Sequence, residues 1–346
     1  MSGGEGEHPG IDEGSVLGWF AAEGIEHVAP LAFTRIGLGQ SNLTYLVRDA
    51  ADRRWVLRRP PLGHLLASAH DVAREARILS ALGPSAVPTP QVFALTTDER
   101  FTDVPLLLME FVDGTVIDTL DVAESLPIEQ RRAIGLAMPA NLARIHAVDL
   151  VGVGLNDLAS HSPYAPRQIK RWTGQWEKSK TRDSAEFDAL TQRLVAAIPE
   201  QTETTLVHGD FHLRNVITDP AAGEIVAVLD WELTTLGDPL ADIGSLLAYW
   251  PEAEDSMAGG FIGANVEGFP KRAELATAYI EQTGREPAAL QYWHTLALWK
   301  LTVIAEGVMR RVIDNPANRA AAGTPMREQV DGILRRAVEV ADAAGI

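Results

Sequence analysis

The chain has 346 residues, of which 46% are hydrophobic and 22% charged, so it can build a sizeable core and is not expected to be disordered. Lys and Arg number 30 and Asp and Glu number 47, which gives a net charge of −17. A chain this acidic repels phosphate backbones and anionic lipid, so we expect no nucleic-acid and no membrane partner. The absence of cysteine excludes disulfides, thiolate-bound zinc and thiol nucleophiles.

The sequence predicts a cytoplasmic location. No segment approaches the ~20 consecutive apolar residues that a membrane-spanning helix needs. Residues 1–14 are rich in Gly and Glu and have neither a basic start nor an apolar stretch, which is typical of a flexible tail and not of a signal peptide. The sequence leaves the oligomeric state open.

The first third of the chain predicts a short helix over residues 15–24 and then a β-rich region. β-Branched and aromatic residues between turn signals indicate strands over 33–36, 43–48, 55–58, 92–96 and 106–111. Apolar residues three and four apart predict a helix over 69–82, which Gly83 and Pro84 end. The strand at 106–111 is almost continuously apolar, so it should be central in an antiparallel sheet or covered on both faces.

Beyond residue 114 the pattern becomes mainly helical. Helices are expected over 128–148, 167–180, 186–197, 242–249, 271–283, 288–309 and 326–344. Short strands are expected over 206–207, 216–218 and 225–229, and the last two form a hairpin.

These elements predict an α+β protein with two lobes. A small antiparallel β-rich N-lobe would precede a larger, mostly helical C-lobe, with ligands bound in the cleft between them. The predicted division is a tail with a helix at 1–30, an N-lobe at 31–112 and a C-lobe at 113–346.

The strongest chemical signal is the segment 206–215, Leu-Val-His-Gly-Asp-Phe-His-Leu-Arg-Asn. A strand delivers His208, the next loop presents Asp210 and Asn215, and a second apolar strand ends on Asp230. Phosphoryl transfer needs such a set, because one carboxylate orients the attacking hydroxyl while another carboxylate and a carbonyl oxygen hold Mg²⁺. Single Asp and Asn residues usually only shape turns, so the ordered set, and no member alone, favours this chemistry.

The histidines allow another interpretation. His208 and His212 could bind zinc in a metal-dependent hydrolase, but Gly209 between them and the strand before them argue against a shared helical face. We favour a structural hydrogen-bonding role for His208. His146 lies on an apolar helix face and is expected to be a core histidine with satisfied ring nitrogens.

Over roughly residues 30–310 the chain resembles the aminoglycoside phosphotransferase family, a small-molecule branch of the protein-kinase-like fold. The stretches 208–215 and 229–232 carry this resemblance most specifically. The segments 56–61, 65–70 and 168–172 are similar to phosphotransferase-like proteins related to the kinase-like segments fused to acyl-CoA dehydrogenases. The resemblance implies transfer of the γ-phosphoryl group of ATP, with Mg²⁺, to a hydroxyl of a small molecule.

The resemblance also implies roles for single residues. Asp210 would be the catalytic base, and Asn215 and Asp230 would be the metal ligands. The nucleotide would be contacted by Gly37, Gly39, Ser41, Asn42, Arg58, Glu75, Glu110 and Val112. Arg58 departs from the family, which has lysine there, but a guanidinium can also bind phosphate through two N–H groups. Its partner would be Glu75, unless the two form only a surface pair.

The acceptor is expected to contact Arg167, Arg171, Trp172 and Trp231. Basic and aromatic groups suit an anionic or acyl compound, and the resemblance to the dehydrogenase-fused segments points to a hydroxy-acyl acceptor. Two alternatives stay open: an aminoglycoside-type kinase, which the acidity of the chain favours, and a catalytically impaired nucleotide-binding module, which Arg58 favours. The Arg and Trp residues of 167–180 could also belong to an ordinary amphipathic helix.

Overall fold

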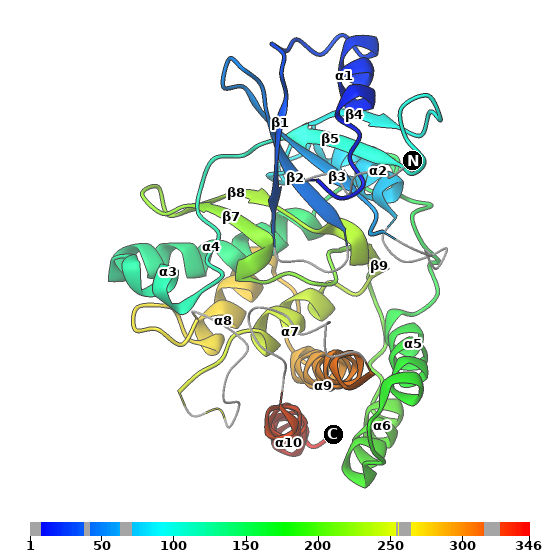
Figure 1. Cartoon of the computed structure of the whole chain (residues 1–346). Helices are drawn as coiled ribbons and strands as arrows, with labels where there is room; N and C mark the ends of the chain where they lie inside the picture. The colour runs from blue at the N-terminus through cyan, green and yellow to red at the C-terminus, as the bar shows by residue number, and fades with distance from the viewer. Residues whose placement is uncertain (1–7, 38–41, 63–70, 254, 256–263, 315–325) are drawn as a thin grey trace. The chain divides into compact units, whose positions relative to one another are not determined.

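The computed structural model describes residues 8–37, 42–62, 71–253, 255, 264–314 and 326–346. The chain forms two compact units (Figure 1). The first comprises Met1–Asp113 with Ala227–Glu232, and the second comprises Gly114–Val226 with Leu233–Ile346.

The first unit is built on a five-stranded antiparallel sheet with the order β1-β2-β3-β5-β4. Its strands are β1 (Ala32–Ile36), β2 (Leu43–Arg48), β3 (Arg54–Arg59), β4 (Val92–Thr96) and β5 (Leu106–Glu110). The helices are α1 (Glu13–Ala22) and α2 (Val72–Leu82). β5 pairs on both sides and its first four residues are buried, which confirms the expectation from its continuous apolar run. Asp71 caps α2 by accepting a hydrogen bond from the Arg74 amide at 2.9 Å.

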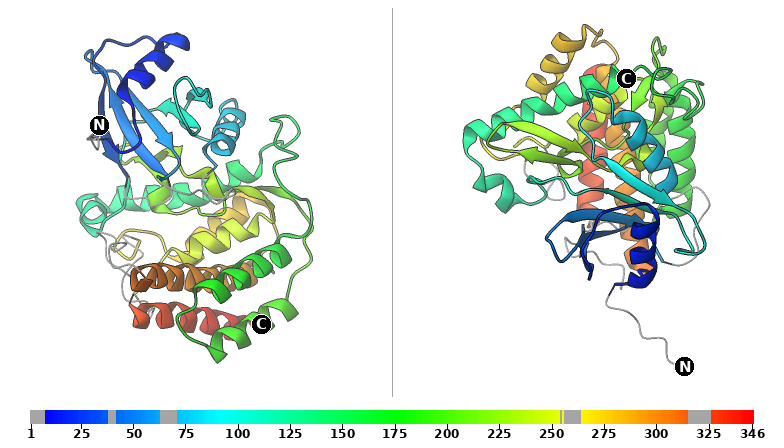
Figure 2. Two further views of the ribbon diagram at one scale, coloured as in Figure 1. Left: turned by 45° about the vertical axis from the view of Figure 1, so that its right-hand side comes forward. Right: turned by 90° about the horizontal axis from the view of Figure 1, so that it is seen from above.

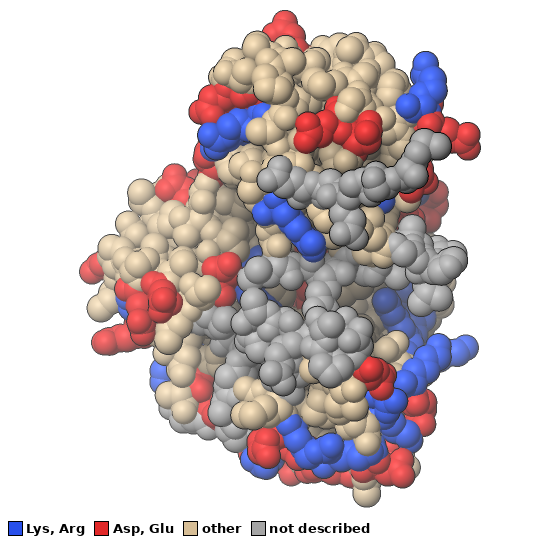
Figure 3. Space-filling model, viewed as in Figure 1, with Lys and Arg blue, Asp and Glu red and all other residues tan. Residues whose placement is uncertain are grey.

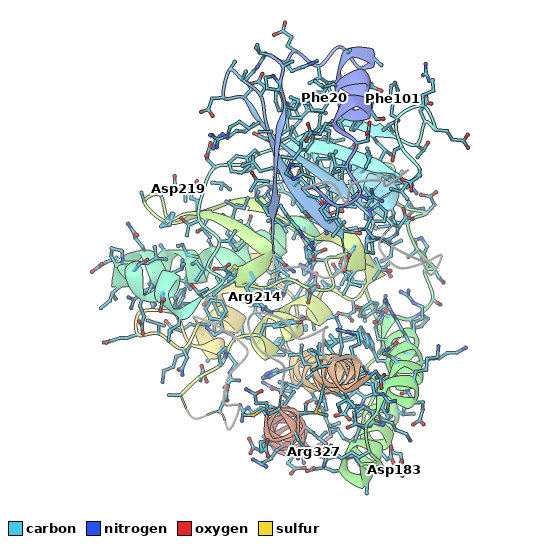
Figure 4. The ribbon with its side chains drawn as sticks, viewed as in Figure 1. Phe20, Phe101, Asp183, Arg214, Asp219 and Arg327 are labelled. Carbon is cyan, nitrogen blue, oxygen red and sulfur yellow. The ribbon has the colours of Figure 1, made fainter. Side chains whose placement is uncertain are left out.

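The core of this unit joins α1 to the sheet. Trp19 and Phe20 of α1 are fully buried in one hydrophobic cluster with Tyr45, Trp55 and strand residues of β1 and β5. Phe20, labelled in Figure 4, makes an edge-on contact with Trp55 at 5.4 Å between ring centroids. The helix near residue 20, which the sequence set apart from the N-lobe, therefore belongs to the same core as the sheet, because its aromatic side chains bury there.

The second unit is mainly helical. Its helices are α3 (Leu120–Ser125), α4 (Ile128–His146), α5 (Tyr164–Ser179), α6 (Ala185–Ala196), α7 (Leu240–Ala248), α8 (Arg272–Thr283), α9 (Leu290–Asp314) and α10 (Arg327–Ala344). α7, α10 and α5 pack against α9, and Figure 2 shows α9 in orange beside α10 in red. α9 is buried along most of its first five turns, so it forms the centre of this unit.

Short strands and turns complete the chain. β6 (Thr205–Val207) pairs antiparallel with β9 (Thr235–Gly237), while β7 (Val216–Asp219) and β8 (Glu224–Val228) form the predicted hairpin. Two 3₁₀ turns, η1 (Leu213–Asn215) and η2 (Trp231–Leu233), follow β6 and β8 along the chain. The α+β class and the antiparallel sheet are confirmed, whereas α3 and β9 were not predicted.

The segment Ala227–Glu232 belongs to the first unit, although the sequence placed it in the C-lobe. Hydrogen bonds within that unit hold it: the Val228 amide donates to the Pro88 carbonyl at 2.8 Å, and Arg74 donates to the Glu232 carbonyl at 3.4 Å. This placement brings Asp230 into the unit that carries the sheet.

None of the helices in the described ranges is long and apolar enough to pass through a bilayer. On the face shown in Figure 3, acidic and basic side chains lie interspersed.

A histidine in the core of the second unit should make folding pH-dependent. His294 on α9 is 4% exposed, and burial beside Arg272 and Arg336 lowers its pKa to about 3. The folded state therefore keeps this ring neutral, whereas the unfolded chain protonates it below its ordinary pKa of 6.5. Its contribution to stability is fully present above pH 6.5 and is lost as the pH falls toward 3, by about 2 kcal/mol at pH 5.

Urea unfolding of the wild type and of His294→Phe at pH 7.5 and pH 5 tests this expectation. The change in the free energy of unfolding between the two pH values should be smaller in the variant by about 2 kcal/mol. Any cost of the substitution that does not depend on pH cancels in this difference. Equal changes in both proteins would contradict the assignment.

Candidate functional site

Asp210 is the centre of a polar cluster in the second unit. β6 ends at Val207, and the loop after it carries Asp210 ahead of η1. The Asn215 amide donates through Nδ2 to the Asp210 carboxylate oxygen Oδ2 at 3.2 Å and to the Asp210 carbonyl at 2.8 Å. The Tyr249 hydroxyl donates to Oδ1 at 2.9 Å, and Nε2 of His212 lies 3.5 Å from Oδ2. The structure thus brings together two of the residues that the sequence singled out, Asp210 and Asn215.

The surroundings of Asp210 keep it ionised. Burial by itself would raise the pKa of its carboxyl, but His212, Lys300 and the Tyr249 hydroxyl outweigh burial and hold the pKa well below its usual range. The side chain is 22% exposed, so a ligand can reach it. An ionised carboxylate accepts hydrogen bonds only, which suits it to orient a hydroxyl and take its proton.

A buried aspartate on α7 fixes the backbone just before Asp210. Asp242 accepts hydrogen bonds from the His208 amide at 2.6 Å and from the Gly209 amide at 2.8 Å. The third partner is His146, whose Nε2 lies 3.2 Å from Asp242, while its Nδ1 lies 2.7 Å from the Tyr279 hydroxyl. Burial opposes the charge of Asp242, yet hydrogen bonds and the neighbouring histidines lower its pKa.

The same hydrogen-bond network shows the roles of His146 and His208. His146 is 3% exposed with both ring nitrogens partnered, as predicted for a core histidine. His208 is fully buried, and its Nδ1 accepts a hydrogen bond from the Asp210 amide at 3.2 Å, which is the structural role that we favoured. Gly209, between His208 and Asp210, has a φ of +86°. A Cβ there would lie 2.8 Å from the Leu233 carbonyl oxygen, so only glycine fits this turn. Sequence reasoning missed Asp242, which it saw only as the start of a helix.

A second cluster lies within the first unit. Arg58 of β3 donates to Glu75 of α2 at 2.7 Å and to Asp230 at 3.3 Å. The Trp231 backbone amide also hydrogen-bonds Glu75. Arg58 and Glu75 are 11% and 2% exposed, so this predicted pair is buried and is no surface pair. Burial would lower the pKa of Arg58, but Glu75 and Asp230 raise it, so the guanidinium stays charged.

Asp230 has an unusual backbone. Its φ is +63°, in the left-handed region that non-glycine residues rarely adopt. Such conformations cost free energy and gather at functional sites, although Asp tolerates them better than most residues.

Only some of the other predicted nucleotide-contacting residues lie within the described part of the chain. Gly39 and Ser41 lie outside the described residues, and Gly37 has φ +78°. Asn42 is 5% exposed, and neither its Oδ1 nor its Nδ2 has a hydrogen-bond partner in the described part of the chain. A buried amide without hydrogen-bond partners is costly. At the last two predicted positions, the Glu110 amide donates to the Gln91 carbonyl at 2.8 Å, and Val112 is half-buried.

The residues predicted to contact the acceptor do not all lie in one site. Arg167 donates to the carbonyls of Leu236 and Ser162, at 2.6 and 3.1 Å, and Arg171 lies over the Trp172 ring on the outside of α5. Trp172 lines a cavity of the second unit.

The assignment of Trp231 to the acceptor site is corrected. This residue lies in the first unit, is fully buried, and donates from Nε1 to the Val228 carbonyl at 3.0 Å. A fully buried indole has no surface left for an acceptor, so it is a core residue.

Within the described ranges, no three or more His, Cys, Asp or Glu side chains gather as they would around a metal ion. A metal site that includes an amide oxygen, such as that of Asn215, is not covered by this statement. The Asn215 amide donates through Nδ2 to Asp210, which leaves its carbonyl oxygen Oδ1 for a cation. Amide and carboxylate oxygens are ligands that suit hard Mg²⁺.

An ionised aspartate followed by an amide after a short strand, and a buried Arg–Glu pair between β3 and α2, are features that phosphoryl transfer uses. The model of the phosphotransferase enzyme family matches residues 32–296, and the chain belongs to this family. The expected kinase-like fold and the resemblance to aminoglycoside phosphotransferases are thereby confirmed.

Individual relatives agree with this placement. Acyl-CoA dehydrogenase family member 10 of Mus musculus is 37% identical over 303 residues, which cover 86% of this chain and 28% of the relative. The chain thus spans less than a third of the length of that relative. A putative aminoglycoside phosphotransferase from Ralstonia eutropha has a TM-score of 0.77 at 29% identity, with 96% of this chain and 97% of that chain covered.

A more distant solved structure shares the fold. It is a thermostable mutant of aminoglycoside phosphotransferase APH(4)-Ia, solved as a ternary complex with AMP-PNP and hygromycin B. Its TM-score is 0.61 at 16% identity, over 95% of this chain and 97% of that chain.

Proposed function

We propose that the chain transfers the γ-phosphoryl group of ATP, with Mg²⁺, to a hydroxyl group of a small molecule. The observation that carries this proposal is Asp210, an ionised and accessible carboxylate held by Tyr249 and Asn215 on a backbone fixed by Asp242. Family membership supports the class of reaction. The distant relative that binds AMP-PNP supports ATP as the donor.

In this proposal Asp210 aligns the acceptor hydroxyl and accepts its proton. Asn215, through Oδ1, and Asp230 would each supply an oxygen ligand to Mg²⁺. When bound, the ion neutralises charge that develops on the phosphates. Arg58 and the Asn42 amide, which has no hydrogen-bond partner among the described residues, would contact phosphate oxygens, and Glu75 orients Arg58 through their ion pair.

We further propose a hydroxy-acyl compound as the acceptor. Two features support this choice: the basic and aromatic side chains of α5, and the similarity to an acyl-CoA dehydrogenase family member. The alternative is a polycationic aminoglycoside, which the similarity to solved aminoglycoside phosphotransferases favours. An acceptor panel separates the two.

A thermal-shift measurement tests the nucleotide half of the proposal. At a nucleotide concentration 100 times Kd, binding stabilises the folded protein by about 2.7 kcal/mol. We expect ATP and AMP-PNP to raise the melting temperature by several degrees with Mg²⁺ and far less with EDTA. Asp230→Asn should lose most of the part that depends on Mg²⁺, whereas a change at the exposed Asp188, Asp188→Asn, should keep it.

The transfer half is measured by release of ADP with a panel of hydroxy acids, their thioesters, diols and aminoglycosides. ADP release that depends on both Mg²⁺ and one acceptor class would support the proposal. If the nucleotide raised the melting temperature but no phosphorylated acceptor formed across the panel, the catalytically impaired module would be the better description.

A further inference from the structure

A small cavity in the second unit borders the backbone next to Asp210. Tyr164 and Trp172 of α5, Ser245 of α7, Trp293 and Lys300 of α9, and Gly209 line it. Its volume of about 30 Å³ has room for one or two water-sized groups, so it fits the oxygen-bearing end of a ligand and not a whole ligand. Trp172 is partly exposed, so the cavity wall reaches the surface there.

Lys300 is the cation of this cavity. Its Nζ donates to the Gly209 carbonyl at 2.7 Å and lies 5.3 Å from the centroid of the Trp172 ring. An ammonium carries three N–H donors, and this carbonyl uses one of them. Burial lowers the pKa of Lys300, while the charges of Asp210 and Asp242 act against that change, so the ammonium lies within electrostatic reach of both carboxylates.

The wall of the cavity carries a second donor, the indole of Trp293. Trp293 is 2% exposed, and its Nε1 has no hydrogen-bond partner in the described part of the chain. On the acceptor side, the carboxylate oxygens of Asp242 already receive the amides of His208 and Gly209. A buried donor without a partner is costly, so Lys300 and the Trp293 indole favour a ligand group that accepts hydrogen bonds.

We propose that Lys300, assisted by the Trp293 indole, binds a carbonyl or carboxylate oxygen of the acceptor and is a specificity-determining residue of this enzyme. The inference rests on the proposed function and deepens it. Gly209 precedes Asp210 in the chain, so the group that holds the acyl oxygen lies next to the group that aligns the hydroxyl.

Direct binding tests this without requiring turnover. Isothermal titration with octanoate, with its N-acetylcysteamine thioester and with octan-1-ol compares an oxygen acceptor with an alcohol of the same length. The wild type should bind octanoate and the thioester at least about tenfold more tightly than octan-1-ol, because hydrogen bonds to a charged donor are among the strong ones. In Lys300→Met this preference should fall by about 10- to 100-fold.

Three further variants sharpen the comparison. Lys300→Arg keeps the charge and should retain most of the preference, and Trp293→Phe should lose a smaller part of it. Lys178→Met changes an exposed lysine of α5 and should bind like the wild type. An unchanged preference in Lys300→Met, or no preference in the wild type, would overturn the proposal.

The shift in melting temperature with Mg²⁺ and AMP-PNP keeps the two proposals apart. It should be the same in Lys300→Met and in the wild type. If the wild type showed no shift, the proposed function would fail, while the acyl-binding comparison would still decide the role of Lys300. Should Lys300→Met not fold, Trp293→Phe and Lys300→Arg measured against the wild type decide it.

Discussion

Replacing Asp210 with Asn is expected to lower the rate of phosphoryl transfer by about 10²- to 10⁴-fold, the range that a positioned general base contributes. The amide keeps the size of the side chain and can still accept the hydrogen bond from Tyr249, but it cannot take a proton from the acceptor. The measurement is steady-state kcat with the acceptor that the panel identifies.

Binding of Mg²⁺ and AMP-PNP separates loss of the base from loss of the site. Asp210→Asn should keep most of the shift in melting temperature that the nucleotide produces in the wild type. Near-native turnover in this variant would remove Asp210 from the role of base. A loss of nucleotide binding together with turnover would instead indicate that the carboxylate mainly shapes the site.

Replacing Asp242 with Ala should destabilise the second unit by about 3–5 kcal/mol, as expected when one partner of a buried charged network is removed. The change leaves two buried backbone amides, those of His208 and Gly209, and one nitrogen of His146 without an acceptor. Urea unfolding followed by circular dichroism measures the loss. Turnover should fall as well, because the backbone before Asp210 loses its anchor.

Two variants calibrate this result. Asp242→Asn keeps one carbonyl oxygen and should lose less stability than Asp242→Ala. Asp188→Ala alters an exposed side chain and should change the free energy of unfolding by less than about 1 kcal/mol. An Asp242→Ala protein as stable as the Asp188→Ala protein would contradict the anchoring role.

The sequence predicted those parts of the fold that repeat or lie close together along the chain. The helices of the second unit follow from apolar residues at helical spacing, and β5 follows from its continuous apolar run. Asp210 and Asn215 could be paired because only five positions separate them. α3 and β9 were missed because elements of six and three residues are too short to show a period.

The missed residues of the site act over long separations in sequence. Asp242 contacts a backbone amide 34 residues before it, and Lys300 contacts a carbonyl 91 residues before it. In the sequence, Lys300 is only an interruption of an apolar stretch and Asp242 only the first residue of a helix. Trp231 was predicted to contact the acceptor because it is an aromatic residue beside a predicted metal ligand. Its indole is fully buried, so that prediction was wrong.

The left-handed backbone at Asp230 restricts which amino acids evolution or an experimenter can place there. Asn and Gly adopt a φ of +63° at low cost, while most other side chains add strain of their own. A saturation library at position 230 would therefore mix folding defects with chemical ones. Two variants of the library separate the folding defects from the chemical ones. Asp230→Gly keeps the backbone conformation but has no side-chain oxygen, and Asp230→Asn keeps both the conformation and a neutral oxygen.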